Sequence, residues 1–395
     1  MADWKKVPLE TLLESGVSYG IVQPGVAEAS GVPIVRVKDV RSGSIDTSDP
    51  LRVSPDIEAK YSRTRLQGGE VLLTLVGSTG QTAVVSDQLA GWNVARAIGV
   101  LRPLPEIPPR WLQYFLESEG AQRYIREHLN TTVQATLNLK DVRALPVPLP
   151  PLQEREAITT AIGALDDKIA VNERIAATTD ELVSALFSAL IAGCSAPEEA
   201  ELGEVALVNS RSVKPESEGA LRYIDISSVG VGSYEWPDRI QWSEAPGRAR
   251  RLASWGSTVW STVRPNRRSH ALVLDTDEDL VFSTGLAVLT PVSVGPAFLY
   301  EATRTPEFQA YLEGVAEGSA YPAVRAERFK EAPLLLPGSA AREKFEEAAM
   351  ALRLRAHQAV AESRTLATLR DALLPQLMSG RLRVKDAEKI VEDHA

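Results

Sequence analysis

The sequence predicts an α+β fold with two similar domains, each followed by a long helix, and with the two helices paired as an antiparallel coiled coil. Two observations lead to this prediction. A proline-rich run at Pro146–Pro151 precedes a long segment with apolar residues at helical spacing, and a degraded copy of that arrangement lies 187 residues further along the chain. An internal repeat of this length implies two domain-plus-helix copies, related by pseudo-two-fold symmetry when the helices pair.

The first domain, residues 1–150, combines short helices with short strands. Residues 1–15 are expected to form a helix, because VPLETLLE places its apolar residues on one side. Helices and strands do not alternate regularly, which argues against a Rossmann-type sheet. Strands are predicted at Val32–Val40, Val71–Val76, Thr82–Val85 and Ala97–Leu101, and further helices at Val53–Thr64 and Pro109–His128.

The first long helix and a linker occupy residues 151–199. The preceding prolines exclude a helix before this point, since each fixes φ and restricts the residue before it. A helix from Glu154 to Leu190 would be roughly 55 Å long, so its apolar stripe must pack against another long helix. Asn172 lies in this stripe and is interpreted as a residue that sets the helix register. The predicted stripe consists of Ile158, Ile162, Leu165, Ile169, Ile175, Leu182, Leu186 and Leu190.

The second copy comprises a domain at residues 200–337 and a long helix with a C-terminal tail at residues 338–395. The offset of 187 residues places Pro146 on Pro333, so the proline-rich run recurs before the second helix. A late helix is expected to begin at Pro306. The two copies share an order of elements but little sequence identity, which predicts one fold with two different surfaces.

The composition is that of an ordinary soluble protein in a reducing compartment. Cys194 is the one cysteine, which excludes a disulfide framework and a cysteine-rich zinc site. We expect no apolar run of bilayer length, and the N-terminal residues lack the apolar core of a signal peptide. The chain is therefore predicted to be cytoplasmic and not bound to a membrane.

The net charge of −9 lies mainly outside the two domains. Residues 151–199 carry three Lys or Arg against nine Asp or Glu. Any affinity for DNA must therefore come from local basic clusters or from a basic partner protein.

The sequence lacks the signatures of common catalytic sites. It has no GxxxxGK[ST] phosphate loop, HExxH, paired CxxC, GxSxG or DPPY-like methyltransferase motif, and its four histidines are scattered. Asp56, Glu58 and Lys60 resemble a nuclease triad in composition, but they lie within five residues and are interpreted as a solvated helix face. The chain is therefore predicted to be non-catalytic, with no metal or cofactor of its own.

The loops of two glycine-bearing hairpins provide the main candidates for DNA contacts. In the second domain, TVRPNRRSH can neutralise phosphates and reach guanine or adenine edges, and an ordinary solvated basic loop is the alternative. The first-domain loop GSTGQT could bind phosphate through backbone N–H groups or be an ordinary turn. The candidates are Ser78, Thr79 and Gln81 in the first loop, and Arg264, Asn266, Arg267, Arg268 and His270 in the second.

A further basic cluster occurs at one repeat-equivalent position in both domains, which favours a phosphate-facing surface. It comprises Lys60, Arg63 and Arg65 in the first domain and Arg248, Arg250 and Arg251 in the second. The weaker candidates on neighbouring loops, each more often structural, are Asn93, Arg96, Gln134, Ser319 and Tyr321.

Two segments now give the chain a family resemblance. They are PLPPLQEREAITTAIGALDDKIAVNERI and PLLLPGSAAREKFEEAAMALRLRAHQAV, each after a variable domain. Over essentially the whole chain this combination closely resembles the specificity subunit of type I restriction-modification systems. The second segment departs from the pattern, with Ala341 where Glu154 would map and no L-D-x-K-I run. The residues of the first segment that the resemblance implies in partner docking are Glu154, Asp166, Lys168 and Asn172.

The resemblance implies two target-recognition domains that bind double-stranded DNA and are held apart by the helix pair. It also implies that two methyltransferase (modification) subunits dock on the helices and that restriction or translocase subunits join through the complex. S-adenosylmethionine, ATP and magnesium would then belong to those partner subunits, and no cofactor to this chain. Because the domains differ, we expect a bipartite asymmetric target with half-sites about one helical turn (~34 Å) or more apart.

Two alternatives stay open at this point. The chain could be a non-catalytic coiled-coil scaffold of another defence complex, although the basic hairpin loop argues against it. It could also be a fused DNA methyltransferase or nuclease with an unrecognised site, which the missing motifs disfavour.

Overall fold

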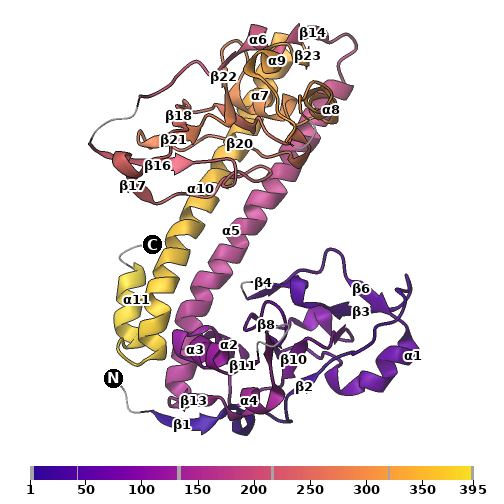
Figure 1. Cartoon of the computed structure of the whole chain (residues 1–395), viewed down its shortest axis with the longest axis vertical. Helices are drawn as coiled ribbons and strands as arrows, with labels where there is room; N and C mark the ends of the chain where they lie inside the picture. The colour runs from indigo at the N-terminus through magenta and orange to yellow at the C-terminus, as the bar shows by residue number, and fades with distance from the viewer. Residues whose placement is uncertain (1–3, 42, 131–134, 215–217, 319–320, 393–395) are drawn as a thin grey trace. The chain divides into compact units, whose positions relative to one another are not determined.

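The computed structural model describes residues 4–41, 43–130, 135–214, 218–318 and 321–392, and Figure 1 labels many of their elements. The chain divides into two compact units. Unit 1 comprises Met1–Ala170 and Arg364–Ala395, and unit 2 comprises Val171–Ser363. Each unit holds one mixed α and β domain together with parts of both long helices, so the expected fold class is confirmed.

Small sheets form the β part of unit 1. Its largest sheet has four antiparallel strands in the order β2 (Ser18–Tyr19), β10 (Ile98–Leu101), β7 (Val71–Thr74) and β8 (Thr82–Val84). A second sheet has the order β6 (Leu51–Val53), β3 (Val32–Val35) and β9 (Asn93–Val94), with β3 and β9 parallel. Two short pairs complete the domain: β4 (Val40–Arg41) with β5 (Ser44–Ile45), and β11 (Leu129–Asn130) with β12 (Thr136–Leu137).

The helices of unit 1 are short, apart from the two that it shares with unit 2. Its α-helices are α1 (Pro55–Glu58), α2 (Pro109–Glu117), α3 (Glu119–Glu127), α4 (Leu139–Ala144) and α11 (Val384–Glu392), with the start of α5 (Leu152–Ala192) and the end of α10 (Ser339–Met378). Its 3-10 helices are Leu9–Leu12, Val37–Asp39, Ala59–Thr64 and Asp87–Leu89.

Three expectations for unit 1 are wrong in detail. The strand expected at Val32–Val40 is interrupted, because the 3-10 helix Val37–Asp39 lies between β3 and β4. Residues 1–15 do not form a helix, because β1 (Lys5–Pro8) pairs antiparallel with β13 (Pro146–Leu149) and a 3-10 turn follows it. The proline-rich run thus finds backbone partners in the N-terminal strand. The helix expected at Pro109–His128 is two helices, since Ser118 has an extended backbone and its hydroxyl caps α3 by accepting a hydrogen bond from the N–H of Ala121.

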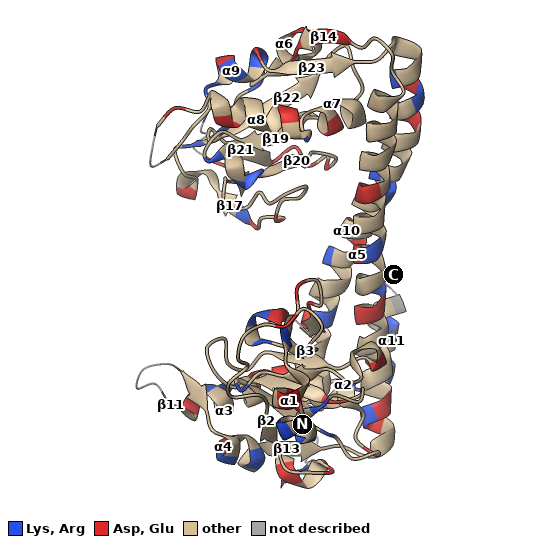
Figure 2. Ribbon diagram, turned by 90° about the vertical axis from the view of Figure 1, so that its right-hand side faces the viewer, with Lys and Arg blue, Asp and Glu red and all other residues tan. Residues whose placement is uncertain are grey.

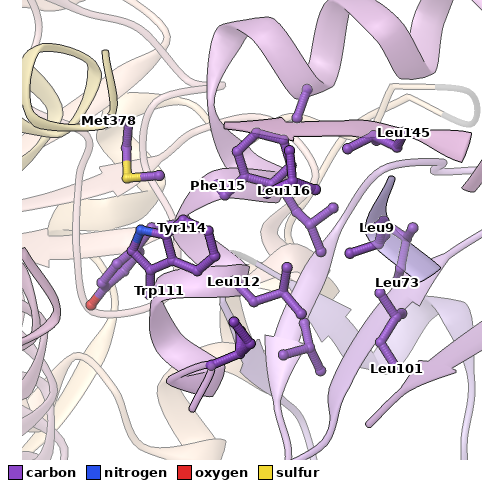
Figure 3. Packing of buried hydrophobic residues seen from close by; sticks show 14 of the residues in the cluster. Leu9, Leu73, Leu101, Trp111, Leu112, Tyr114, Phe115, Leu116, Leu145 and Met378 are labelled. Carbon is purple, nitrogen blue, oxygen red and sulfur yellow. The ribbon is translucent and has the colours of Figure 1, made fainter. Parts of the chain in front are cut away.

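Helix α2 organises the core of unit 1. Figure 3 shows its residues Trp111, Leu112, Phe115 and Leu116 between apolar side chains of neighbouring elements, with Met378 of α10 nearby. All of these side chains are buried, with an exposed fraction below a tenth. Leu73 of β7 and Leu101 of β10 belong to the same cluster, so α2 joins the sheet to the end of α10. The aromatic-rich sequence of α2 is therefore a packing surface.

Unit 2 repeats the arrangement with longer strands. One sheet has the order β15 (Ala206–Val208), β22 (Leu286–Pro291), β19 (Thr258–Ser261) and β20 (His270–Leu272), and another has β17 (Arg239–Gln241), β16 (Ala220–Ile224), β21 (Leu280–Ser283) and β18 (Ala249–Arg251). β14 (Glu198–Glu201) pairs with β23 (Pro333–Leu336). The helices are α6 (Leu202–Val205), α7 (Pro296–Ala302), α8 (Pro306–Gly314) and α9 (Ala326–Lys330), with 3-10 turns at Trp242–Glu244 and Pro265–Arg267.

The repeat of 187 residues holds for several pairs of elements. The starts of α2 and α7, of α4 and α9, of β13 and β23, and of α5 and α10 all differ by 187. In each unit a parallel strand pair, β3 with β9 or β16 with β21, accompanies a four-stranded antiparallel sheet. Helix α7 was not expected from the sequence, although Pro296 is the counterpart of Pro109 at the start of α2. The two domains therefore share one topology.

The two long helices contact each other antiparallel. In unit 2, Asn172 and Asp180 of α5 bind Glu362 and Arg353 of α10, so the residue number falls on α10 as it rises on α5. In unit 1, Asp166 of α5 binds Arg370 of α10. The coiled-coil prediction is confirmed at this level.

The predicted apolar stripe is correct in the first half of α5 and partly wrong in the second, where Leu190 packs against the core of unit 2 but Leu182 and Leu186 do not. Ile158, Ile162 and Leu165 are buried in unit 1. Leu182 and Leu186 are exposed, whereas Val183 and Phe187 are buried in unit 2. The contacting stripe runs through Asn172 and Thr179, both buried, to Val183, which keeps the heptad spacing. Thr179 is polar, so the apolar spacing of the sequence does not reveal that the stripe passes through it to Val183.

Helix α5 is also the one helix, within the residues that the structure describes, long and apolar enough to cross a membrane by length and composition. The expectation that no apolar run reaches bilayer length is therefore wrong. One side of the second half of α5 packs in unit 2, where Phe187 contacts the rings of Phe298 and Phe345. Asp180 in the same half pairs with Arg304 and Arg353. These contacts bury one side of this half of α5, whereas Leu182 and Leu186 on another side are exposed.

Candidate nucleic-acid interface

The loop between β19 and β20 in unit 2 is held in an unusual backbone conformation. Arg264 and Arg268 have φ values of +53° and +56°, in the left-handed region that side chains other than glycine rarely adopt. They flank the 3-10 turn Pro265–Arg267. Such strain persists only where the surroundings fix the backbone, and it is typical of functional loops.

Several contacts fix this loop. The N–H of Arg264 donates to the carbonyl oxygen of Pro322 at 2.7 Å, and the guanidinium of Arg264 lies 4.6 Å from the centre of the Tyr321 ring. The guanidinium of Arg268 donates to the carbonyl oxygen of Arg304 at 3.0 Å. Asn266 and Arg267 are exposed at the turn itself. The loop therefore presents an amide and a guanidinium from a rigid support, with Tyr321, 69% exposed, beside them.

His270 does not belong to this exposed group. It is buried, stacks on Trp260 with ring centres 4.7 Å apart, and its Nδ1 lies 2.6 Å from the carbonyl oxygen of Arg268. Burial lowers the pKa of His270 to about 4, so the ring is neutral at physiological pH. Its expected DNA contact is wrong, because a neutral buried ring on β20 is a core side chain.

The corresponding loop of unit 1, between β7 and β8, is polar but not basic. Ser78 and Gln81 are exposed, and the Thr79 hydroxyl lies within hydrogen-bond distance of two backbone carbonyls. Gly80 has a φ of +90°, which closes the turn with the conformation that glycine favours. The loop can donate and accept hydrogen bonds but brings no positive charge of its own.

The two loops share a second feature. In unit 1, Val76 pairs with Thr136, in the segment just before α4. In unit 2, the repeat-equivalent Val263 pairs with Ala323, just before α9. Each hairpin tip is therefore joined to the same second loop of its own domain. Gln134 and Ser319, two predicted contacts in these second loops, lie outside the described residues.

The two basic clusters border equivalent strands. Lys60 and Arg63 are exposed on the 3-10 helix Ala59–Thr64, and the N–H of Leu66 just beyond it donates to the carbonyl oxygen of Trp92, beside β9. In unit 2 the counterpart is β18, which pairs with β21. The same edge thus carries basic residues as a helical turn in one domain and as a strand in the other.

Within these clusters the side chains differ in availability. Arg65 forms two hydrogen bonds with Glu58, and this pairing holds the pKa of Glu58 below its ordinary value. Arg248 is exposed, whereas Arg250 and Arg251 are half-buried. Lys60, Arg63 and Arg248 are therefore the cations of this edge best placed for phosphate.

Asn93 is a structural residue. Its side chain is fully buried, accepts a hydrogen bond from the Thr64 hydroxyl at 2.7 Å, and donates to the Glu58 carboxylate at 3.0 Å. Burial removes Asn93 from the candidate DNA contacts, while Arg96 nearby is exposed. Glu58 itself is buried, so the interpretation as a solvated helix face holds for Asp56 and Lys60 but not for Glu58.

Comparisons with known proteins match this fold. Residues 1–178 match the family model of the type I restriction modification DNA specificity domain. This match covers less than half of the chain. The chain is 30% identical over 166 residues to the type I restriction enzyme EcoBI specificity subunit of Escherichia coli, covering 41% of this chain and 35% of that protein. It is 28% identical over 175 residues to the EcoKI specificity subunit of Escherichia coli strain K12, with 41% and 36% covered.

A solved structure supports the same fold for the rest of the chain. The type I restriction-modification S subunit of M. genitalium superposes with a TM-score of 0.62 over 95% of this chain and 96% of that one, at 15% identity. The matched part of the chain spans about a third of the length of each of these two Escherichia coli relatives. Among the described residues no group of three or more His, Cys, Asp or Glu side chains could hold a metal ion.

The predicted docking residues on α5 occupy different environments. Asn172 is fully buried and its amide donates to Glu362 at 2.8 Å, so it is not available to a partner protein. Asp166 is partly buried and accepts hydrogen bonds from the Tyr114 hydroxyl and from Arg370. Glu154 is half-buried and Lys168 is exposed.

Sequence reasoning missed two features of the helices. The first is an exposed apolar set on one side of α5, Val171, Leu182 and Leu186, with exposed fractions of 47%, 46% and 37%. Spacings of 11 and 4 residues place them on a common side of a 3.6-residue helix, a signal hidden because Leu182 and Leu186 were assigned to the core. The second is the ion-pair group of Asp180 with Arg304 and Arg353, whose partners lie too far apart in sequence to be matched.

Proposed function

We propose that this chain is the non-catalytic DNA-recognition subunit of a type I restriction-modification complex. Each domain would bind one half-site of double-stranded DNA through its hairpin tip, the loop joined to it and the neighbouring basic edge. The observation that supports this most is the repeat of one loop pairing in both domains, with different side chains exposed at each tip. A shared scaffold with unlike tips suits a bipartite asymmetric target.

In unit 2 the exposed side chains suit direct recognition of bases. Arginine binds guanine O6 and N7 through two hydrogen bonds, and asparagine binds adenine N6 and N7 in the same way. Arg267 and Asn266 carry these groups on a loop whose backbone is fixed by Arg264 and Arg268. In unit 1 Ser78 and Gln81 provide hydrogen bonds, and Lys60 and Arg63 provide charge for phosphate.

Catalysis would reside in partner subunits. Methyltransferase subunits would bring S-adenosylmethionine, and restriction or translocase subunits would bring ATP and magnesium. We place the docking surface on the exposed side of α5, where Val171, Leu182 and Leu186 provide apolar area and Lys168 lies nearby. A target base extruded from the duplex would enter the partner's catalytic pocket. The complex would act in the cytoplasm.

The test measures DNA binding by the assembled complex. Arg267→Ala is expected to weaken binding by about 1–3 kcal/mol and to relax the consensus at one position, because it removes a base contact and leaves the loop contacts of Arg264 and Arg268 intact. Titrations at several salt concentrations and mapping of modified adenines in the host genome provide the measurements. If the affinity instead falls equally for all DNA sequences and depends less steeply on salt concentration, Arg267 contacts a phosphate and not a base.

Arg328→Ala is the matched control. Arg328 lies on α9 of the same unit and pairs with Glu331, away from the hairpin tip in sequence and contacts. Unchanged affinity and consensus are expected for it. If Arg267→Ala behaves like this control at low salt, the alternative of a scaffold without DNA contacts gains support. Methylation of DNA by the purified chain without partners would instead favour a fused enzyme.

A further inference from the structure

Two ion pairs between the long helices, one in each unit, have the same polarity. In unit 1 the acid, Asp166, is on α5 and the base, Arg370, is on α10, at 3.0 Å. In unit 2 Asp180 is again on α5 and Arg353 on α10, at 2.5 Å. The side chains are 9% to 38% exposed, so solvent screens these charges less than on an open surface.

We propose that this polarity makes α5 accept α10 and reject a second copy of α5, and makes α10 reject a second copy of itself. The partner that each helix fits is thus the other helix of the repeat, which excludes like-with-like pairing between two copies of the chain. The argument rests on the helix contacts and not on the proposed function.

The repeat shows what like-with-like pairing would bring together. In unit 2, Asp180 faces Arg353, and position 353 is the counterpart of Asp166. A second α5 in place of α10, in the same register, would therefore put Asp166 of the copy against Asp180. By symmetry this clash occurs twice, with no arginine from α10 to neutralise it.

The converse pairing fails for the same reason. In unit 1, Arg370 faces Asp166, and the counterpart of position 166 is Arg353. A second α10 in place of α5 would put Arg353 of the copy against Arg370, again twice. Both like pairs thus juxtapose equal charges, whereas the pair in the structure joins opposite ones. This is discrimination by repulsion as well as by attraction.

The surroundings of Asp180 strengthen the effect. Arg304 of α7 also binds this carboxylate, at 2.7 Å. Burial alone would raise the pKa of Asp180, but the hydrogen bonds from Arg304 and Arg353 outweigh it and hold the pKa at about 2. The counterpart of Arg304 in the repeat is Glu117. A doubled first half would therefore surround Asp180 with two further carboxylates in place of two arginines.

The experiment starts from the complete, folded chain. A protease site is inserted between Ser195 and Ala196, in the linker after α5, and the purified protein is cut there into a first and a second half. Unlabelled and isotope-labelled cut samples are mixed, and urea is raised until the labels are scrambled among the pairs of unlike halves. Native mass spectrometry then counts pairs of unlike halves and of like halves. Like pairs are expected to be at least ~10-fold rarer than random re-pairing gives.

The decisive variant is Asp166→Arg combined with Arg370→Asp. It keeps opposite charges between α5 and α10 in unit 1, so the uncut chain retains its pairing. It also places the new arginine opposite Asp180 of a copied first half, and the new aspartate opposite Arg353 of a copied second half. Like pairs are expected to rise at least ~10-fold over the unaltered chain.

The matched control is Glu156→Arg combined with Arg355→Asp, which makes the same charge changes at exposed positions of the same helices. Its like pairs are expected to stay as rare as in the unaltered chain. The proposal is overturned if the unaltered halves re-pair at random, or if the decisive variant forms no more like pairs than this control.

Discussion

At the scale of single residues, burial decides which polar side chains can contact DNA. Asn93 and His270 have the residue types expected of a DNA contact, yet both are buried. Asn266 and Arg267 are of the same chemical kinds and are exposed on a fixed loop. The difference lies in the backbone: β9 and β20 turn their side chains into the core, and the turn between Arg264 and Arg268 turns them out.

His270 makes a prediction about acid stability. Because the folded-state pKa is about 4 and the ordinary value is about 6.5, the unfolded chain binds a proton in this range that the folded chain does not. The stability from this group is therefore complete above pH 6.5 and is lost as the pH falls towards 4. Between pH 7 and pH 5 it should reduce the free energy of unfolding by about 2 kcal/mol.

The measurement compares urea unfolding of the unaltered chain and of His270→Asn at both pH values. Asparagine keeps a hydrogen-bond donor for the carbonyl oxygen of Arg268 but does not titrate. Between pH 7 and pH 5, the free energy of unfolding of the variant is expected to fall by about 2 kcal/mol less than that of the unaltered chain. His128→Asn, at an exposed position, is the control, and its free energy of unfolding should fall on acidification as much as that of the unaltered chain. Equal acid sensitivity in all three proteins would contradict the lowered pKa of His270.

At the scale of elements, α5 has two apolar sides with different roles. Val183 and Phe187 pack in the core of unit 2, while Leu182 and Leu186 are exposed. Because it is apolar on two sides, α5 has the length and apolar composition of a membrane-spanning helix. Its buried side serves the fold, and its exposed side is free for a partner protein.

The two sides can be separated by alanine substitution. Val183→Ala is expected to lower the free energy of unfolding by about 2 kcal/mol, because it leaves a cavity in a packed core. Leu182→Ala, one position away, should change it by no more than ~0.5 kcal/mol. Under the proposed function, Leu182→Ala with Leu186→Ala should instead weaken binding of a methyltransferase subunit, measured by calorimetry. Strong destabilisation by Leu182→Ala would place that residue in the core after all.

Much of the fold could be predicted from the sequence because its signals are local. Prolines mark β13 and β23, the glycine turn marks the β7–β8 hairpin, and the offset of 187 places α5 and α10. The errors arise where distant residues decide. Residues 5–8 form a strand because β13 pairs with them. Val183 of α5 is buried because it lies in the same apolar cluster as Phe187, which contacts Phe298 and Phe345.

The candidate site was predictable only in part. The arginines of the second hairpin form a basic cluster that is recognisable in the sequence, and Arg267 is exposed in the structure. The fixing of that loop by Pro322, Tyr321 and Arg304 could not be foreseen, because these residues lie far along the chain. Nor could the burial of Asn93, which depends on Glu58 and Thr64.

At the scale of the whole molecule, the proposed function makes the length of the helices a determinant of the DNA target. Seven residues inserted after Arg174 in α5, with seven after Val360 in α10, would keep the heptad pairing and add about 10 Å to each helix. The unrecognised spacer between the half-sites should then lengthen by about three base pairs. Mapping of methylated adenines in cells that carry the altered chain measures this.

Insertion into α5 alone is the matched control for this prediction. It shifts the later part of α5 against α10 and breaks the contact of Asn172 with Glu362 or that of Asp180 with Arg353. Loss of methylation is expected from it, without a new spacer length. An unchanged spacer in the double insertion would show that the helices do not set the distance between the half-sites.

The composition of unit 1 from Met1–Ala170 and Arg364–Ala395 affects the order of events during protein synthesis. The first domain is synthesised long before the end of α10. The apolar surface around Trp111 therefore lacks its contact with Met378 until more than two hundred further residues have been translated. Unit 2 is one contiguous segment, so its chain is complete sooner. Translation would therefore finish the second unit before the first, and truncated products would expose the unfinished core to chaperones and proteases.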